Sequence, residues 1–215
     1  MNSHQTRILV FGARSFAEEV ADLAAEVPYL RVVGFVENYD RDRATTLHGL
    51  PVYWIDDVEH LAATHKAVCG LGTTLRIPLI SQASRMGFEF TPVIHPASRV
   101  SPTATVGAGS IVSAGSIIAA HAAIGSHVVI NRGALIGHHS QIDDCTNIGP
   151  GANIGGACRI EAGVYVGIGA TLIDHLTIGP GTVIGAGAVV TRDLPARVMA
   201  VGVPAKVIKE NIEGK

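Results

Sequence analysis

The chain has 215 residues, enough for two domains, and carries a formal net charge of -2 from 16 basic and 18 acidic residues. These charges are mixed along the chain and form no basic patch for nucleic acid or an anionic membrane, so small-molecule partners are favoured. The sequence shows neither an export signal nor an apolar stretch of membrane-spanning length, so we expect a cytoplasmic protein.

Strands and helices are predicted to alternate in residues 1–93. Apolar runs predict strands over 7–12, 31–36 and 67–72, and apolar side chains at helical spacing predict helices over about 15–26 and 75–86. This alternation is typical of a parallel sheet. We therefore expect a small α/β domain with a Rossmann-like sheet.

A ligand pocket is expected where these strands end, because open parallel sheets bind ligands at the carboxyl ends of their strands. The first turn lacks the second and third glycines of the dinucleotide fingerprint, so no nicotinamide cofactor is expected. Backbone N–H groups at the helix start, with Arg14 beside them, suit a phosphate, and Glu37 suits a ribose or a base. The alternative is that Arg14 and Glu37 are solvated loop residues. The candidate ligand residues are Gly12, Arg14, Ser15, Glu37, Asn38 and Gly72.

Residues 100–195 form sixteen consecutive six-residue units without an insertion. The second position is Gly in eight units and Asn or Asp in two, and we interpret it as the bend because these residues tolerate positive φ. The fifth position is usually small. Every first position is aliphatic: Val100, Val106, Val112, Ile118, Ile124, Ile130, Ile136, Ile142, Ile148, Ile154, Ile160, Val166, Leu172, Ile178, Ile184 and Val190.

Such a period predicts a parallel β-helix with three units in each triangular coil. Sixteen units make five full coils and one further side, and residues eighteen apart stack directly. Cys158 falls at an inward small position, and none of Cys69, Cys145 and Cys158 has a paired spacing. We interpret these three cysteines as reduced core thiols.

Histidines cluster in the repeat, where His121 and His139 occupy the same position of adjacent coils and His175 lies two coils further along. Neutral imidazoles are good zinc ligands, and hexapeptide-repeat proteins resembling γ-class carbonic anhydrases bind metal through three histidines. In this chain only His121 and His127 have a comparable arrangement. Solvated surface histidines are the favoured interpretation, and no metal site is expected.

Three features together resemble a known family: the unbroken hexapeptide repeat, the segment from Asn131 to His138-His139, and the Gly202-Val203-Pro204-Ala205 turn before the tail. The chain is similar to the left-handed hexapeptide-repeat acyltransferases, and in particular to bacterial N-acetyltransferases of nucleotide-linked amino sugars of the bacillosamine, perosamine and viosamine type. Sialic acid O-acetyltransferases are related. The likeness extends over nearly the whole chain.

This resemblance implies a nucleotide-sugar-binding domain at 1–93, a left-handed parallel β-helix at 94–195, and a turn and tail at 196–215. It also implies a homotrimer. Acetyl-CoA would be a co-substrate, with no tightly bound cofactor, and the acceptor would be the amino group, on C4, of a deoxy sugar carried on UDP, GDP or dTDP. Transfer would be direct, because no Cys or Ser nucleophile is indicated beside His138.

The resemblance also implies roles for single residues. His138 would be the general base, and Asn131, which matches a family Asn, would orient it. His139 stands where relatives usually have Asp or Glu, and Arg14-Ser15-Phe16 stands where they often have Gly-Gly-His or Ser-Gly-His. Gly156, eighteen residues after His138, is expected beside it. The residues expected to bind acetyl-CoA are Asn147, Gly156, Ile168, Ala186 and Lys206.

Three other functions stay open from the sequence. An O-acetyltransferase acting on a sialic acid or another sugar hydroxyl would use the same base. A metal-dependent hydratase resembling carbonic anhydrase would need zinc at His121. A non-catalytic scaffold would use the helix only to form trimers.

Overall fold

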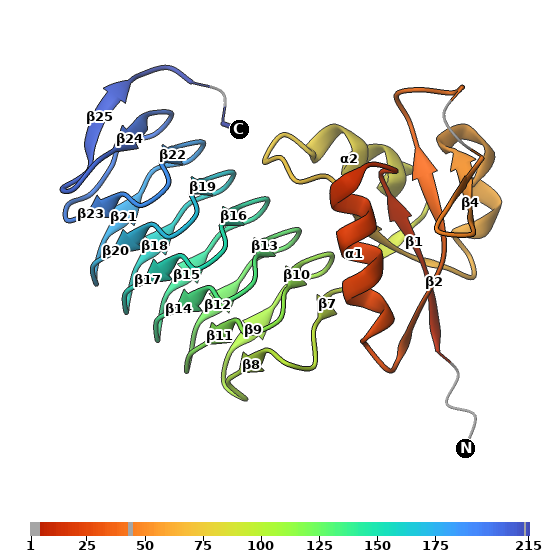
Figure 1. Ribbon diagram of the computed structural model, residues 1–215, viewed down its shortest axis with the longest axis horizontal. Coiled ribbons are helices and arrows are strands. Elements are labelled where there is room, and N and C mark those ends of the chain that lie inside the picture. The colour runs from red at the N-terminus through yellow and green to blue at the C-terminus, as the bar shows by residue number, and fades with distance from the viewer. Residues whose placement is uncertain (1–4, 43–44, 213) are drawn as a thin grey trace.

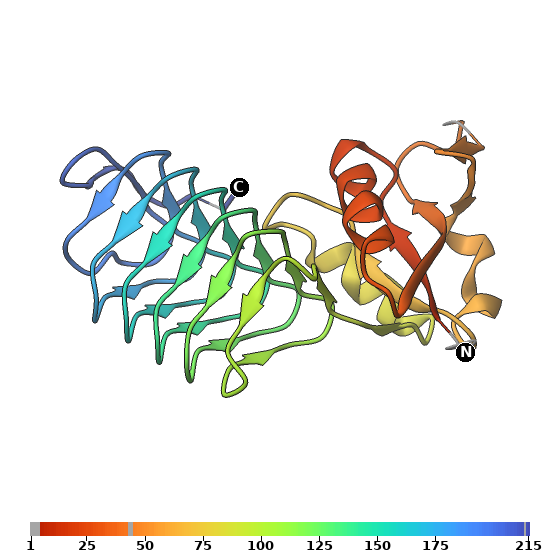
Figure 2. The same ribbon diagram turned by 60° about the horizontal axis from the view of Figure 1, so that its bottom comes forward.

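The computed structural model describes residues 5–42, 45–212 and 214–215, and places an α/β domain beside a long triangular β-helix (Figures 1 and 2). The chain passes from the α/β domain into the β-helix near Val93, and successive coils lie further from the point of entry. None of the helices formed by the described residues is both long and apolar enough to cross a membrane.

The α/β domain is built on a mostly parallel sheet with the spatial order β3-β4-β2-β1-β5-β6. The predicted strands and helices are confirmed, whereas β3, β4 and β6 were not expected from the sequence. Between β4 and β5 lie short 3₁₀ turns at Ile55–Asp57 and Glu59–Leu61. The regular elements are β1 (Thr6–Phe11), α1 (Ser15–Ala25), β2 (Leu30–Glu37), β3 (Thr46–Leu47), β4 (Leu50–Trp54), β5 (Lys66–Cys69), α2 (Ile77–Arg85) and β6 (Glu89–Phe90).

The β-helix consists of strands of two residues, stacked in parallel at a spacing of eighteen residues, as predicted. Face 1 contains β7 (Val93–Ile94), β10 (Ile111–Val112), β13 (Val129–Ile130), β16 (Asn147–Ile148), β19 (Tyr165–Val166), β22 (Val183–Ile184) and β24 (Met199–Val201). Face 2 contains β8 (Arg99–Val100), β11 (Ile117–Ile118), β14 (Leu135–Ile136), β17 (Asn153–Ile154), β20 (Thr171–Leu172) and β23 (Val189–Val190). Face 3 contains β9 (Thr105–Val106), β12 (Ala123–Ile124), β15 (Gln141–Ile142), β18 (Arg159–Ile160) and β21 (Thr177–Ile178).

The ladder on face 1 extends beyond the sequence repeat at both ends. It begins with β7, before the first repeat unit, and continues into β24, after the last one. Inside the prism, the first-position and fifth-position side chains form one buried cluster that includes Ile136, Ile154 and Cys158. Full burial of one such aliphatic side chain stabilises the fold by about 1.5–3 kcal/mol. All three cysteines are buried and free, in agreement with their interpretation as core thiols.

The bend of each unit was assigned to the wrong position. Positive φ falls on the fourth position of most units, as at Gly151 (64°) and His139 (60°), and not on the second. The second-position glycines meet a different requirement, because the next coil passes directly over them. A Cβ on Gly137 would lie 2.4 Å from the backbone of Gly155. Glycine is therefore needed there for close approach of two backbones.

Three edges separate the faces, and they are named here by the faces they join. Edge 1/2 contains turns such as 131–134 and 167–170, edge 2/3 contains 119–122 and 137–140, and edge 3/1 contains 125–128 and 143–146. Face 1 packs on the α/β domain: its outward residues Ile111 and Val129 share a buried cluster with residues of β1 and α1. Edge 2/3 lies on the opposite side of the prism from face 1.

The C-terminal segment returns from the far end of the helix towards the α/β domain (Figure 1). After β25 (Lys206–Lys209), which pairs antiparallel with β24, Ile212 is buried against the last coil. The carbonyl oxygen of Lys215 accepts a hydrogen bond from the Thr74 N–H at 2.6 Å, and the Lys215 Nζ lies 4.2 Å from the centroid of the Tyr165 ring. The tail therefore links the last coils to the loop that follows β5.

Replacement of Gly149 tests the close-approach requirement. A Cβ at this second position would lie 2.7 Å from the Val166 carbonyl oxygen, so Gly149→Ala should destabilise the fold by about 1–3 kcal/mol through overpacking. The matched control is Gly151→Asn, because Gly151 has a φ of 64° that Asn tolerates and has open space around it. Thermal unfolding should show a clearly lower Tm for Gly149→Ala only. Equal Tm values for the two variants would contradict this explanation.

Candidate functional site

A pocket of about 330 Å³ lies at the carboxyl ends of β1, β2 and β5. Gly12 and Arg14 line it from the loop after β1, Glu37 and Asn38 from the end of β2, and Leu71 from the loop after β5. Because these strands are parallel, their carboxyl ends meet at one edge of the sheet. The structure thus brings together four of the six residues predicted to bind a ligand here.

The other two predicted residues lie beside the pocket and are not among the residues that line it. Ser15 is the exposed first residue of α1. Gly72 faces Phe16, and a Cβ on Gly72 would lie 3.3 Å from the Phe16 Cγ. The Phe16 ring therefore packs against the loop after β5, and only a small residue at position 72 leaves it that room.

The chemistry of the pocket comes from one buried carboxylate and one exposed cation. Glu37 is only 4% exposed, and its Oε1 accepts hydrogen bonds from the backbone N–H groups of Asn38 and Tyr39, both at 2.9 Å. The Arg14 guanidinium lies 5.3 Å from the centroid of the Tyr39 ring. Glu37 is thus not a solvated loop residue. An arginine suits phosphate oxygens, and a carboxylate suits hydroxyl or N–H donors.

A second group of polar side chains lies on edge 2/3. His138 and His139 are both exposed, and their Nδ1 atoms are 3.1 Å apart. The rings of His139 and His121, one coil away, have centroids 4.8 Å apart. His121, His139 and His175 all have φ near 60°, a conformation in which His is enriched among the non-glycine residues. The turn geometry alone therefore explains why these three histidines line up on one edge, whether or not they have a chemical role.

Gly156 lies against the ring of His138, as its spacing of eighteen residues predicts. A Cβ on Gly156 would be 2.8 Å from both Cε1 and Nε2 of His138. A larger residue at position 156 would therefore displace this ring. Nε2, which lies against Gly156, is the ring nitrogen that does not face His139.

Asn131 does not lie beside His138 within one chain. It is on edge 1/2, one strand away, and its Oδ1 accepts hydrogen bonds from the N–H and Nη1 of Arg132. The expected role of Asn131 in orienting His138 stays a prediction, but the two side chains do not meet within one chain. The physical reason is the period of the repeat: residues seven apart fall on neighbouring edges of the prism.

The residues predicted to bind acetyl-CoA fall in different places. Ile168 and Ala186 stack on edge 1/2, where both are exposed, whereas Gly156 is on edge 2/3. Lys206 is exposed in β25. Asn147 is 5% exposed on face 1, and its side chain bonds to Arg76 and to the carbonyl oxygen of Gly72. A single surface groove of one chain does not join all five.

The arrangement of histidines does not support the metal-hydratase alternative. His121 is on edge 2/3, whereas His127 is on edge 3/1 with its ring edge-on to Phe90 at 4.6 Å between centroids. Across the described residues, no group of three potential His, Cys, Asp or Glu ligands comes together. The two histidines that were compared with a zinc site are therefore not neighbours.

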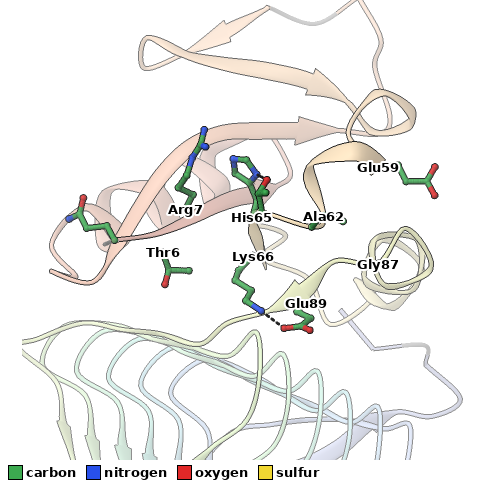
Figure 3. Close-up of a pocket in the computed structure, with 11 residues that line it drawn as sticks. Thr6, Arg7, Glu59, Ala62, His65, Lys66, Gly87 and Glu89 are labelled. Carbon is green, nitrogen blue, oxygen red and sulfur yellow. Dashed lines mark hydrogen bonds and ion pairs between the residues drawn. The ribbon is translucent and has the colours of Figure 1, made fainter. Parts of the chain in front are cut away.

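A larger cavity, of about 730 Å³, lies at the opposite edge of the α/β sheet (Figure 3). Arg7 and Lys66 line it at the amino ends of β1 and β5, and Lys66 pairs with Glu89. Parallel sheets bind ligands at their carboxyl ends, so size alone does not make this cavity the site.

Sequence reasoning missed Arg76, the largest fully buried side chain. It immediately precedes α2, although a cation is unfavourable at a helix N-terminus. A positive charge at the start of a predicted helix was the feature of the sequence that could have indicated specific partners for Arg76. Tyr39 and Leu71, which line the pocket, were also missed, because an exposed aromatic or a loop Leu carries no distinctive pattern.

Comparison with solved structures identifies the family. Over 93% of its length the chain matches 95% of a histidine-to-asparagine mutant of perosamine N-acetyltransferase from Caulobacter crescentus, in complex with CoA and GDP-perosamine, with 32% identity and a TM-score of 0.86. The chain belongs to the hexapeptide-repeat acetyltransferases. Residues 157–192 of this acetyltransferase match the family described as bacterial transferase hexapeptide (six repeats).

Two further structures resemble this acetyltransferase over nearly its whole length. The acetyltransferase domain of PglB from Neisseria gonorrhoeae, in complex with acetyl coenzyme A, is 30% identical with a TM-score of 0.88, and 95% of this chain covers 100% of that one. WeeI from Acinetobacter baumannii is 29% identical with a TM-score of 0.86 and the same coverage. None of the curated protein sequences matches the chain. The family predicted from the repeat, the His138-His139 segment and the GVPA turn is thus confirmed.

His127 gives the fold a pH dependence that can be measured. Burial lowers the pKa of His127 below its ordinary value of 6.5, the Arg76 cation lowers it further, and Asp144 opposes the change. Below pH 6.5, His127 therefore binds a proton in the unfolded chain but not in the folded chain. The contribution of His127 to the free energy of unfolding therefore falls as the pH drops from 7 to 5. His127→Asn, which tolerates the φ of 55°, should reduce this loss. Denaturant unfolding at pH 7 and pH 5 measures this loss of stability. An equal loss in the wild type and in His127→Asn would contradict the assignment of the pH dependence to His127.

Proposed function

We propose that this acetyltransferase transfers the acetyl group of acetyl-CoA to the amino group of a nucleotide-linked amino deoxy sugar. Family membership makes the protein an acetyl-CoA-dependent N-acyltransferase with acetyl-CoA as its co-substrate. The relative from Caulobacter crescentus is bound to GDP-perosamine, and this chain matches it across both domains. The acceptor is expected to carry its amine on C4 and to be linked to UDP, GDP or dTDP.

The pocket of the α/β domain supports the nucleotide part of this proposal. Arg14 at its rim would hold the diphosphate, with the backbone N–H groups at the start of α1 beside it. The buried carboxylate of Glu37 would accept hydrogen bonds from the ribose or the base. Phe16 packs against Gly72 at the position where relatives often have His, so the acceptor sugar meets an apolar side chain there.

The observation that carries the proposed chemistry is the exposed His138 ring against Gly156. Nε2 of His138 accepts the proton of the amine as its nitrogen attacks the thioester carbon of acetyl-CoA. The new C–N bond forms, the C–S bond breaks, and CoA leaves as its thiol after taking up a proton. The Gly156 N–H would donate to the carbonyl oxygen while negative charge develops on it.

His139 replaces the carboxylate that relatives usually place after the base. Its Nδ1 is 3.1 Å from the Nδ1 of His138, so one of these atoms donates and the other accepts. When His138 donates, its Nε2 is free of hydrogen and able to act as the base. We infer that His139 accepts this hydrogen bond in the active enzyme and so holds His138 in its productive tautomer.

The geometry favours a site shared between copies of the chain. His138 is on edge 2/3, whereas the pocket belongs to the domain that covers face 1, on the opposite side of the prism. A pocket supplied by a neighbouring copy would reach His138 in a homotrimer whose helices pack side by side. Ile168 and Ala186, on edge 1/2, would then hold acetyl-CoA in the groove between two helices, with Lys206 near the CoA phosphates.

Replacement of His138 tests the general base. His138→Asn should lower turnover about 100-fold or more, because general-base catalysis contributes factors of that size. The measurement is release of the CoA thiol from acetyl-CoA with a panel of UDP-, GDP- and dTDP-linked amino sugars. The control is His175→Asn, a change at the same edge two coils away that should leave activity unaltered. Retention of more than about a tenth of the activity in His138→Asn would remove His138 from this role.

A further inference from the structure

Arg76 connects the pocket loop to the β-helix through an unusual set of bonds. It is 1% exposed, and its partners are carbonyl oxygens and one amide side chain. Its Nε donates to the His127 carbonyl at 3.1 Å, and its Nη2 donates to the same carbonyl at 2.8 Å and to the Asn147 Oδ1 at 2.6 Å. These bonds hold the guanidinium on edge 3/1 and face 1.

The remaining donors of the guanidinium fix the loop after β5. Nη1 of Arg76 donates to the carbonyl oxygens of Leu71, at 3.3 Å, and of Thr73. The Nδ2 of Asn147 donates to the carbonyl between them, that of Gly72, at 3.0 Å. Three consecutive carbonyls of this loop are thus held by two side chains, one of which projects from the β-helix. We name these two side chains the Arg76–Asn147 clamp.

The loop held by the clamp forms one wall of the pocket. Leu71 lines the pocket together with Glu37, and a Cβ on Gly12 would lie 3.1 Å from the Gly70 carbonyl oxygen and 3.2 Å from the Leu71 Cδ2. The loop after β1 and the loop after β5 therefore touch. Because of this contact, a displacement of the carbonyls at 71–73 changes the width of the pocket.

Two ion pairs between the α/β domain and the β-helix lie away from this wall. His95 pairs with Glu26 at 3.1 Å, and Arg132 pairs with Glu19. Both pairs join α1 or its C-terminal end to the first coils of the helix. They hold the α/β domain on the helix without touching the residues that line the pocket.

We propose that the Arg76–Asn147 clamp is a positioning device for the acceptor, which sets the pocket wall for a nucleoside diphosphate and holds it in register with the β-helix. This inference rests on the proposed function. It assigns Asn147 to the acceptor side of the reaction, whereas the family likeness had placed Asn147 with the acetyl donor. The two assignments predict different kinetic effects. Loss of the clamp raises the KM for the nucleotide sugar, whereas loss of a donor-binding residue raises the KM for acetyl-CoA.

Asn147→Asp is the sharpest test. The carboxylate still accepts from Arg76, but it no longer donates to the Gly72 carbonyl and repels it. The Gly72 carbonyl then leaves its position and the pocket wall moves with it, so the Kd for the nucleoside diphosphate and the KM for the nucleotide sugar should rise about tenfold or more. The KM for acetyl-CoA and the kcat at saturating sugar should stay within about twofold.

Two further variants complete the experiment. Arg76→Lys keeps the charge but has three donors in place of five, and it should weaken diphosphate binding in the same way. Glu26→Gln is the matched control: it breaks the ion pair with His95 and should change neither Kd nor KM. If Arg76→Lys does not fold, Asn147→Asp alone decides. Binding of UDP, GDP and dTDP is measured by calorimetry and transfer by CoA release.

Each outcome decides the proposal. Equal diphosphate binding by the wild type and Asn147→Asp, or a raised KM for acetyl-CoA alone, would overturn the clamp while the proposed function stands. Diphosphate binding that weakens in Asn147→Asp, in a protein that acetylates none of the amino sugars, would support the clamp and overturn the proposed acceptor. A wild-type protein that binds none of the three diphosphates would overturn both.

Discussion

The backbone hydrogen bonds between successive coils, which align residues eighteen apart, determine where the functional side chains of the β-helix lie. Each coil donates backbone N–H groups to the next one, as from Gly137 to Ile154 and from Gly155 to Leu172, so no coil is stable without its neighbours. Because of this regular pairing, the position of a residue in the sequence determines its edge and its coil. Six residues move a side chain to the next edge of the prism, and eighteen residues return it to the same edge one coil higher.

This constraint separates the two halves of the proposed site. The α/β domain covers face 1, so its pocket lies on one side of the prism, and His138 lies on the opposite edge. A β-helix is rigid along its ladder, so domain motion within one chain would have to carry the pocket from face 1 across a whole neighbouring face. The proposed association of copies avoids this movement, since a neighbour's pocket needs only to be brought to an exposed edge.

The pocket of the α/β domain depends on the same ladder through a different contact. Arg76 reaches from the loop after β5 to the carbonyl oxygens of His127 and Thr146, which are placed by successive coils. A buried guanidinium is costly unless all of its N–H groups are bonded, and here carbonyl oxygens from both parts of the molecule bond them. The shape of the pocket is therefore coupled to the β-helix and is not a property of the α/β domain alone.

Much of this arrangement follows from the sequence. The aliphatic first positions predict the coils, and the spacing of eighteen places Gly156 against His138. The same arithmetic places Asn131 on another edge of the same chain, so its expected role beside His138 stays a prediction. The second-position glycines were misread because a glycine required for close approach looks the same as one required for positive φ, although the fourth positions are also rich in Gly.

The partners of Arg76 and Asn147 were beyond sequence reasoning. A loop arginine has no periodic pattern, and the carbonyl oxygens that it binds belong to segments about fifty and seventy residues away. Likewise, nothing in the segment around Glu37 indicates that its side chain turns back to its own backbone. Such contacts depend on how the two parts of the molecule pack.

The most direct test of this account is activity in oligomers that contain two different inactive chains. His138→Asn and Arg14→Glu chains with different affinity tags would be co-expressed, and oligomers carrying both tags would be assayed for CoA release with the nucleotide amino sugar. A site shared between copies predicts activity well above that of either variant alone, because an intact pocket then faces an intact His138. Activity equal to the average of the two inactive variants, or failure of the two chains to associate, would contradict it.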